Sequence, residues 1–136
     1  MKRLILSISI TIGLLSCQSD ISPKKLIGVW APTYQIQNKE ANGKWGRWIT
    51  INTLMAIPDM EFTASGDFLR DGKPGAACCS AGNKYTLSGN TITFSEIKDC
   101  PNVDCSLSYQ WKIHELTSKF LILEFGESRS KYARVK

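Results

Sequence analysis

The sequence predicts an all-β domain, folded as an eight-stranded antiparallel up-and-down barrel. Short segments alternate between apolar and polar residues, as strands with one buried face do. Most connections between these segments are short and contain turn-forming residues. No segment after the N-terminal region keeps a helical periodicity. A two-sheet β-sandwich made of the same strands is the alternative.

The predicted strands follow from this alternation, which is clearest where Leu107, Tyr109, Trp111 and Ile113 oppose polar neighbours. In chain order the strands are expected at 26–36, 60–63, 68–70, 84–87, 91–95, 106–114, 120–125 and 131–135. The first connection, 37–57, is long and unusually apolar. Such a loop is typical of a lid or binding loop, or it adds a short strand near 48–51 or packs on the core.

The N-terminus resembles a bacterial lipoprotein signal. Lys2 and Arg3 precede an apolar run, Leu4 to Leu15, that is too short to span a bilayer comfortably. A small residue and then Cys17 follow this run, as in the bacterial lipobox. The resemblance implies that residues 1–16 are a cleaved signal peptide and that Cys17 carries lipid.

A polar stretch separates the predicted lipid from the domain. Residues 17–25 are therefore expected to form a lipidated tether, and residues 26–136 the barrel domain. Lipoprotein sorting rules favour the outer membrane because Gln18, and not Asp, follows the cysteine; the periplasmic and cell-surface faces both remain open. Removing residues 1–16 lowers the formal net charge from +5 to +3. This mild excess comes without a nucleic-acid motif, so no nucleic-acid partner is expected.

The two ends of the domain are predicted to meet. Gly28 and Trp30 lie on one face of the first strand, and Arg134 in the last strand can stack on the indole by cation–π attraction. An even number of meander strands brings Arg134 back to the end where Trp30 lies. We call this the closed end. The connections assigned to it are short, at 64–67, 88–90 and 116–119.

A Gly-x-Trp motif at the start of the first strand, with an Arg on the last, resembles the lipocalin superfamily. The pattern is most similar to the short bacterial lipocalin-like domain lipoproteins, and it covers 26–135. This resemblance implies that Gly28, Trp30 and Arg134 close a barrel. It also implies a small hydrophobic ligand at the opposite, open end.

Four cysteines remain once Cys17 is assigned to the lipid. An even number in an exported protein predicts disulfides. A bridge between the adjacent Cys78 and Cys79 is strained, so these two are expected to pair with Cys100 and Cys105, in either combination. The bridges would join two loops at the open end. A four-thiolate zinc site is less favoured because Cys78-Cys79 lacks C-x-x-C spacing, and no metal or other cofactor is expected.

No catalytic motif is present, and the protein is not expected to be an enzyme. His114 is the only histidine, and it lies on the polar face of its predicted strand. Neither a nucleophile motif nor a phosphate-binding glycine loop accompanies it.

Two functions fit these observations. The first is a lipid-anchored binding protein that holds a small hydrophobic ligand at the open end of the barrel. Its candidate ligand-binding residues are inward aromatics and two tryptophans of the long connection: Phe62, Tyr85, Phe94, Tyr109, Trp111, Trp45 and Trp48. The second is a surface or periplasmic lipoprotein with a filled barrel and no ligand. It would contact a protein partner through the long connection, where Arg47 lies between two tryptophans.

Overall fold

A computed structural model describes residues 21–103, 105 and 109–135. The predicted signal peptide 1–16, the lipidation site Cys17 and the first part of the tether lie outside the described residues. Within the described part of the chain, no helix is both long and apolar enough to cross a membrane.

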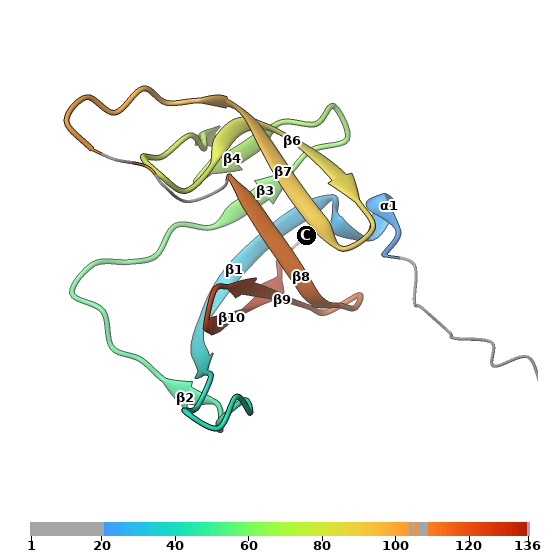
Figure 1. The fold of residues 1–136 in the computed structure, drawn as a ribbon. Helices are drawn as coiled ribbons and strands as arrows, with labels where there is room; N and C mark the ends of the chain where they lie inside the picture. The colour runs from blue at the N-terminus through green and yellow to red at the C-terminus, as the bar shows by residue number, and fades with distance from the viewer. Residues whose placement is uncertain (1–20, 104, 106–108, 136) are drawn as a thin grey trace, which may run out of the picture.

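The described chain forms one short helix and ten strands, which wrap into a nearly closed barrel (Figure 1). Nine of the strands follow a single antiparallel path in the order β5-β4-β3-β1-β10-β9-β8-β7-β6, and β2 pairs with β1 beside this path. In chain order the elements are α1 Pro23–Leu26, β1 Gly28–Asn38, β2 Ile49–Thr50, β3 Met60–Phe62, β4 Phe68–Arg70, β5 Lys73–Pro74, β6 Gly82–Ser88, β7 Thr91–Ile97, β8 Gln110–Leu116, β9 Phe120–Phe125 and β10 Ser128–Arg134.

The fold class is confirmed and the strand count is not. The eight predicted strands correspond to β1, β3, β4 and β6 to β10, while β2 and β5 add two very short strands. β2 lies where a short strand was one of the alternatives for the long connection. Leu26, expected in the first strand, is instead the last residue of α1. The strands form one continuous sheet, so the sandwich alternative does not apply.

β1 is bent, and its two ends pair with different strands. Its residues 28–30 pair with β3, and its residues 35–36 pair with β2. The register shifts between Pro32 and Gln35, where Pro32 has no amide hydrogen to donate and Tyr34 has a φ of 58°. The bulge turns the second half of β1 away from β3.

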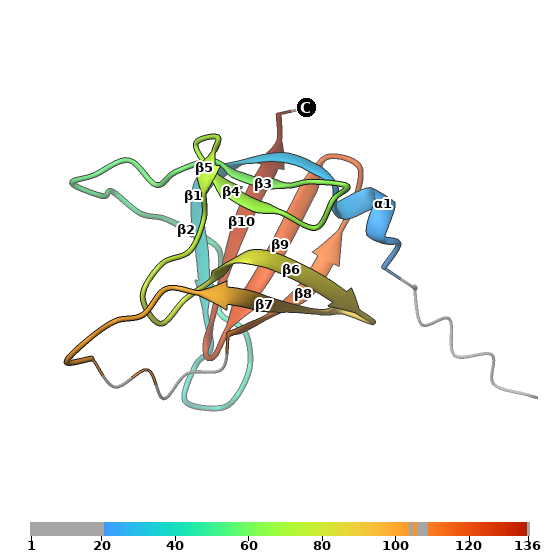
Figure 2. The ribbon, with the colours of Figure 1, turned by 90° about the horizontal axis from the view of Figure 1, so that it is seen from above.

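Closure of the barrel is uneven around its circumference (Figure 2). The first and last strands pair as predicted, from Trp30 opposite Arg134 to Asn38 opposite Ser128. That pairing alone does not close the sheet, because β4 must also reach β6. Between these two strands the structure has an isolated bridge, Asp67 opposite Lys84. The barrel is therefore nearly closed, with its gap between β4 and β6.

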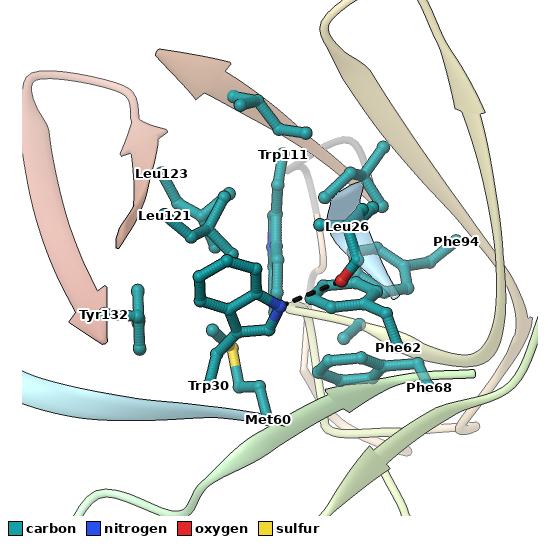
Figure 3. Close-up of a cluster of buried hydrophobic side chains, with 13 residues drawn as sticks. Leu26, Trp30, Met60, Phe62, Phe68, Phe94, Trp111, Leu121, Leu123 and Tyr132 are labelled. Atoms are coloured by element: carbon teal, nitrogen blue, oxygen red, sulfur yellow. Dashed lines mark hydrogen bonds between the residues drawn. The ribbon is translucent and has the colours of Figure 1, made fainter. Parts of the chain in front are cut away.

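The interior is filled largely by aromatic side chains (Figure 3). Phe68 packs edge-on against both Phe94 and Trp111, with ring centroids 5.1 and 5.4 Å apart. Phe62 lies 5.2 Å from Phe68, and Trp30 lies in the same cluster with no exposed surface. Tilted and edge-to-face arrangements at these distances are the favoured packing of aromatic pairs.

Candidate functional site

The closed end is sealed by Trp30 and Arg134. The indole Nε1 donates a hydrogen bond to the carbonyl oxygen of Leu26 at 2.9 Å. The Arg134 guanidinium lies 4.1 Å from the centroid of the indole ring. It also donates to the carbonyl oxygens of Ile27 at 2.8 Å and Ser118 at 3.0 Å. Arg134 thus ties α1, the turn after β8 and the last strand together, and it leaves this end packed.

Gly28, the third residue assigned to closure, has a φ of 137°, in a region that favours glycine. It lies opposite Phe62 in the β1–β3 ladder. A side chain at this position would strain the backbone where the chain leaves α1 and begins β1. The glycine of the Gly-x-Trp motif is therefore explained by backbone conformation.

Three of the predicted ligand-binding aromatics belong to the packed core. Phe62 has no exposed surface. The Tyr85 ring packs edge-on at 5.0 Å from it, and the Tyr85 hydroxyl donates to the Thr63 carbonyl oxygen at 2.8 Å. Phe94 lies 4.5 Å from Trp111 and is almost fully buried. These rings fill the barrel and do not line its mouth.

A hollow of about 190 Å³ remains at the open end, with one side open to solvent. We call it the mouth pocket. Of the predicted ligand-binding residues, it includes Trp111 alone. Side chains from five different strands and two connections line it: Ile57, Pro58, Met60, Arg70, Ser80, Trp111, Phe125 and Tyr132.

Arg70 is the charged residue of the mouth pocket. It lies two residues after the buried Phe68 on β4, and alternation therefore places both side chains on the inner face. Its Nη2 donates to the Ser80 Oγ at 3.4 Å, and its Cζ lies 5.6 Å from the Phe68 ring centroid. Burial lowers the pKa of Arg70 from its ordinary value. The guanidinium nevertheless stays protonated, as arginine does in proteins.

Tyr132 faces the same pocket from β10 and is almost fully buried. Burial raises the pKa of its phenol, while the positive charge of Arg70 and a hydrogen bond with Ser130 act in the opposite direction. The phenol is therefore neutral at physiological pH and can donate a hydrogen bond.

Two disulfides hold one wall of the mouth pocket. They pair Cys78 with Cys100 and Cys79 with Cys105, with Cα atoms 5.8 and 4.9 Å apart. The predicted link between the two loops is confirmed, and the open choice of pairing is settled. The zinc alternative is wrong, because both bridges together use all four thiols. Ser80 follows Cys79 directly in the sequence, and its carbonyl oxygen accepts a hydrogen bond from the Trp111 Nε1 at 3.1 Å.

The tryptophans expected as a lid lie elsewhere. Trp45 stacks on Arg129, whose Cζ is 3.6 Å from the ring centroid. Arg129 pairs with Glu124 on the outer face of β9 and β10, so Trp45 covers the outside of the barrel. Trp48 precedes β2 and is 36% exposed. Tyr109 packs partly buried against the core. Trp45 lies away from the mouth because the turn at 39–45 folds back toward β10, where it contacts Arg129.

Sequence reasoning missed Arg70, Tyr132, Phe125 and Ser80 as pocket residues. The signal for Arg70 was present, because Phe68-x-Arg70 alternates and a buried Phe68 forces the arginine inward. His114 lies on β8 with its side chain largely exposed. The partial burial that remains, and then the charge of Arg129, lower the pKa of its imidazole. Among the described residues, no group of three potential metal ligands comes together.

Comparisons with known proteins found structural likeness only. No protein-family model and no curated protein matches this chain. It is similar to the crystal structure of a lipocalin-like protein from Bacteroides uniformis, at 16% identity and a TM-score of 0.38, over 81% of this chain and 98% of the other. An uncharacterized protein from Bacteroides eggerthii is similar at 12% identity and a TM-score of 0.42, over 80% and 98%. At these identities and TM-scores, both likenesses concern the fold alone.

Proposed function

We propose that the protein is a lipid-anchored binding protein that holds a small, largely apolar molecule in the mouth pocket. The observation that supports this most is the hollow itself, in which aromatic and aliphatic side chains converge at the open end of an otherwise filled barrel. Concave, mainly apolar hollows with a few polar groups are the usual sites of small ligands.

The size of the hollow limits the ligand. Its volume of about 190 Å³ is below the ~300 Å³ at which typical ligand pockets begin. The aromatic core leaves the ligand no room to go deeper, since Phe94 and Trp111 are in contact below the pocket. The ligand is therefore small, or only one end of a longer molecule enters.

Native mass spectrometry of the chain from residue 18 onward, extracted gently from cells, tests ligand binding. This chain contains every residue of the described core. We expect a co-purifying small mass that Phe125→Trp, which fills the mouth pocket, removes. Phe120→Trp is the matched control, because Phe120 lies under Lys131 on the outer side of the same strand. A wild-type protein without any bound mass, or one mass shared equally by all three proteins, would contradict the proposal.

The lipid anchor is tested separately. We expect metabolic labelling with a fatty acid to mark the wild-type protein in the outer-membrane fraction. Cys17→Ser is expected to abolish both the label and the membrane association. Labelling that survives Cys17→Ser would contradict anchoring at this residue, without bearing on the mouth pocket.

A protein-interaction role is the second candidate, and exposed apolar residues of the connection between β2 and β3 favour it. Leu54 is fully exposed and Met55 is 80% exposed, and Ile49 of the preceding strand β2 is exposed as well. Isolated exposed apolar residues are ordinary, but a row of them on one connection is typical of an interaction surface. Leu54→Ser with Met55→Ser is expected to abolish co-purification of a partner after cross-linking in cells, and to leave the small co-purifying mass unchanged.

A further inference from the structure

We infer that the ligand of the mouth pocket is a monocarboxylate with an apolar tail, and that Arg70 binds its carboxylate. This inference rests on the proposed function, because it names the chemistry of the molecule that the same pocket holds. It follows from three features: an inward cation without a counter-ion among the described residues, two neutral hydroxyl groups that line the same hollow, and an apolar remainder.

The cation has no counter-ion among the described residues. The carboxylates nearest in the chain are engaged elsewhere: Asp71 accepts a hydrogen bond from the Asp59 amide at 2.9 Å, and Asp67 pairs with Lys84 at 2.5 Å. On the far side of the barrel, Glu124 is paired with Arg129 on the outer face. Within the described part of the chain, no carboxylate therefore pairs with the positive charge of Arg70 at the hollow.

Most of the hydrogen-bonding capacity of Arg70 is also free. A guanidinium has five N–H donors in a planar fork. The hydrogen bond to Ser80 is long, at 3.4 Å, and engages one of the two terminal nitrogens. A half-buried charge of this kind is costly at the edge of an apolar core, where an apolar side chain would pack better. A bound anion removes that cost.

The surroundings of Arg70 favour a carboxylate over a more highly charged anion. One cation balances one negative charge, and the guanidinium fork matches the two oxygens of a carboxylate. Ser80 and Tyr132 line the same hollow and add neutral hydroxyl groups beside the fork. A phosphate dianion would need a second positive charge, and the lining of the hollow contains none besides Arg70.

The rest of the hollow specifies an apolar tail. Met60, Trp111 and Phe125 face the space beside Arg70. The volume of 190 Å³ corresponds to that of about six water molecules in the liquid. It therefore accepts the carboxylate with a few carbon atoms, and a longer tail leaves the barrel past Ile57 and Pro58, which line the rim.

Octanoate and 1-octanol are the probes that test this inference, because they share a tail length and differ in charge. NMR titration of the chain from residue 18 onward gives both affinities, and the indole N–H signal of Trp111 reports occupancy. We expect the wild-type protein to bind octanoate about 10- to 100-fold more tightly than octanol, the range for a hydrogen bond to a charged group. Arg70→Met is expected to remove this preference by weakening octanoate alone.

The control variant is Lys73→Met, which removes the same charge from an exposed residue that lies opposite Arg70 in the β4–β5 pair. It is expected to keep the preference for octanoate. Unfolding curves verify that both variants are folded. Equal affinities for the two probes in the wild-type protein would overturn the inference and leave the apolar pocket standing. A preference that persists in Arg70→Met would exclude Arg70 as the binding residue. No response of Trp111 to either probe would overturn the proposed function as well.

Discussion

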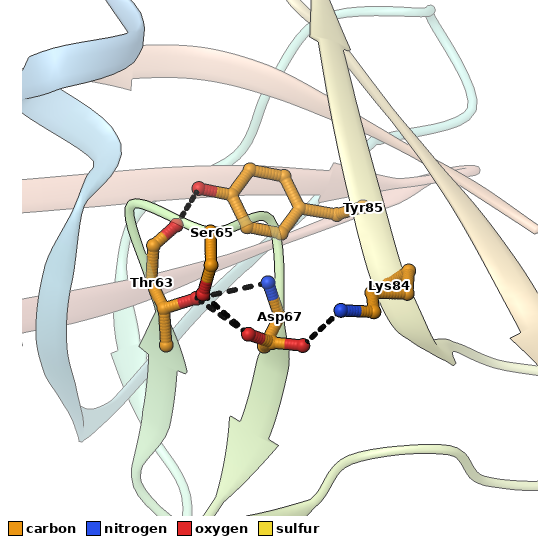
Figure 4. A network of polar contacts seen from close by, with 5 residues as sticks. All are labelled: Thr63, Ser65, Asp67, Lys84 and Tyr85. Atoms are coloured by element: carbon orange, nitrogen blue, oxygen red, sulfur yellow. Dashed lines mark hydrogen bonds and ion pairs between the residues drawn. The ribbon is translucent and has the colours of Figure 1, made fainter.

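The barrel is joined at two places that differ in kind. Between β1 and β10, a backbone ladder runs from Trp30 to Asn38, and the guanidinium of Arg134 seals its end. Between β4 and β6, side chains do most of the joining. Asp67 forms an ion pair with Lys84 (Figure 4). Next to this pair, the Tyr85 amide donates a hydrogen bond to the Gly66 carbonyl oxygen. We call these the ladder seam and the side-chain seam.

The difference separates the part of the barrel that joins the two ends of the domain from the part that borders the mouth pocket. The ladder seam joins the two ends of the domain beside the buried Trp30, so we expect it to contribute most to stability. The side-chain seam is held at the closed end by the Asp67 network, whereas at the open end the disulfides join the β5–β6 connection to the β7–β8 connection. The mouth pocket lies next to the side-chain seam, because Arg70 of β4 and Ser80 of the β5–β6 connection line it.

Trp30→Ala is expected to have the largest effect, because it removes the plug of the ladder seam. Truncating a fully buried aromatic residue typically lowers the free energy of unfolding by about 3 to 5 kcal/mol. Denaturant unfolding measures the change. Trp48→Ala, at an exposed tryptophan, is the control and should change stability by less than about 0.5 kcal/mol. A near-neutral Trp30→Ala would show that the ladder seam does not depend on its plug.

Removing the bridge between Cys78 and Cys100 is expected to come next. The double substitution Cys78→Ser with Cys100→Ser frees a loop with a sequence separation of 22. The chain-entropy relation then gives a loss of about 3 kcal/mol. Ser80 keeps only the bridge of its neighbour Cys79 to Cys105, so octanoate binding should weaken together with stability. Non-reducing peptide mapping verifies the remaining bridge, and unchanged binding would show that the pocket wall stands without this disulfide.

Arg134→Met is expected to lower the free energy of unfolding by about 1 to 3 kcal/mol, from the lost stacking on Trp30 and the lost hydrogen bonds to carbonyl oxygens. Its methionine still covers the indole, which is why the loss stays below that of Trp30→Ala. Hydrogen exchange should report the change first in the amides of β1 and β10. An equal loss at the side-chain seam would mean that the two seams unfold together.

Asp67→Asn is expected to have the smallest effect, because its ion pair with Lys84 is solvent-exposed. The amide of Tyr85 should exchange faster in the variant, while the amides of the ladder seam should not change.

In the wild-type protein, hydrogen bonds from Lys84 and then Ser65 lower the pKa of Asp67 below its ordinary 3.8.

This shift gives the side-chain seam a defined pH dependence. A lowered carboxyl pKa means that the contribution of the pair is complete above about pH 4 and is lost as the pH falls through the folded-state pKa. The Asp67 hydrogen bond raises the pKa of Lys84, so on the basic side the contribution is lost as the pH rises through that raised pKa. Acid should therefore abolish the difference in Tyr85 exchange between the wild-type protein and Asp67→Asn. A difference that persists in acid would exclude this pair as its cause.

The parts of the fold that repeat a pattern could be predicted from the sequence. Alternation located the long strands, and the positions of the cysteines located the linked loops. β2 and β5 could not be predicted, because two residues carry no periodicity. The gap beside β4 has a similar origin, since β4 spans only Phe68–Arg70 and is too short to pair with all of β6. Trp45 was misplaced because a long connection contains no signal for the side of the barrel on which it folds.

The candidate site was harder to predict than the fold. Aromatic residues were expected at the mouth because large rings bind ligands, but most of them fill the core, as in any small barrel. The informative residue was the exception to the pattern, a charged Arg70 at an inward position. Charged side chains are mostly exposed in folded proteins, so Arg70 looked like an ordinary surface residue.

The helix α1 brings the chain to the barrel at the closed end, on the side away from the connection between β5 and β6 (Figure 2). Between the predicted acyl-carrying cysteine and Pro23 lie only five residues, a span of at most about 18 Å. If Cys17 carries lipid, as proposed, we expect the barrel to lie close to the bilayer with its closed end toward the attachment point. The proposed ligand would then reach the mouth pocket from the aqueous side and not from within the lipid.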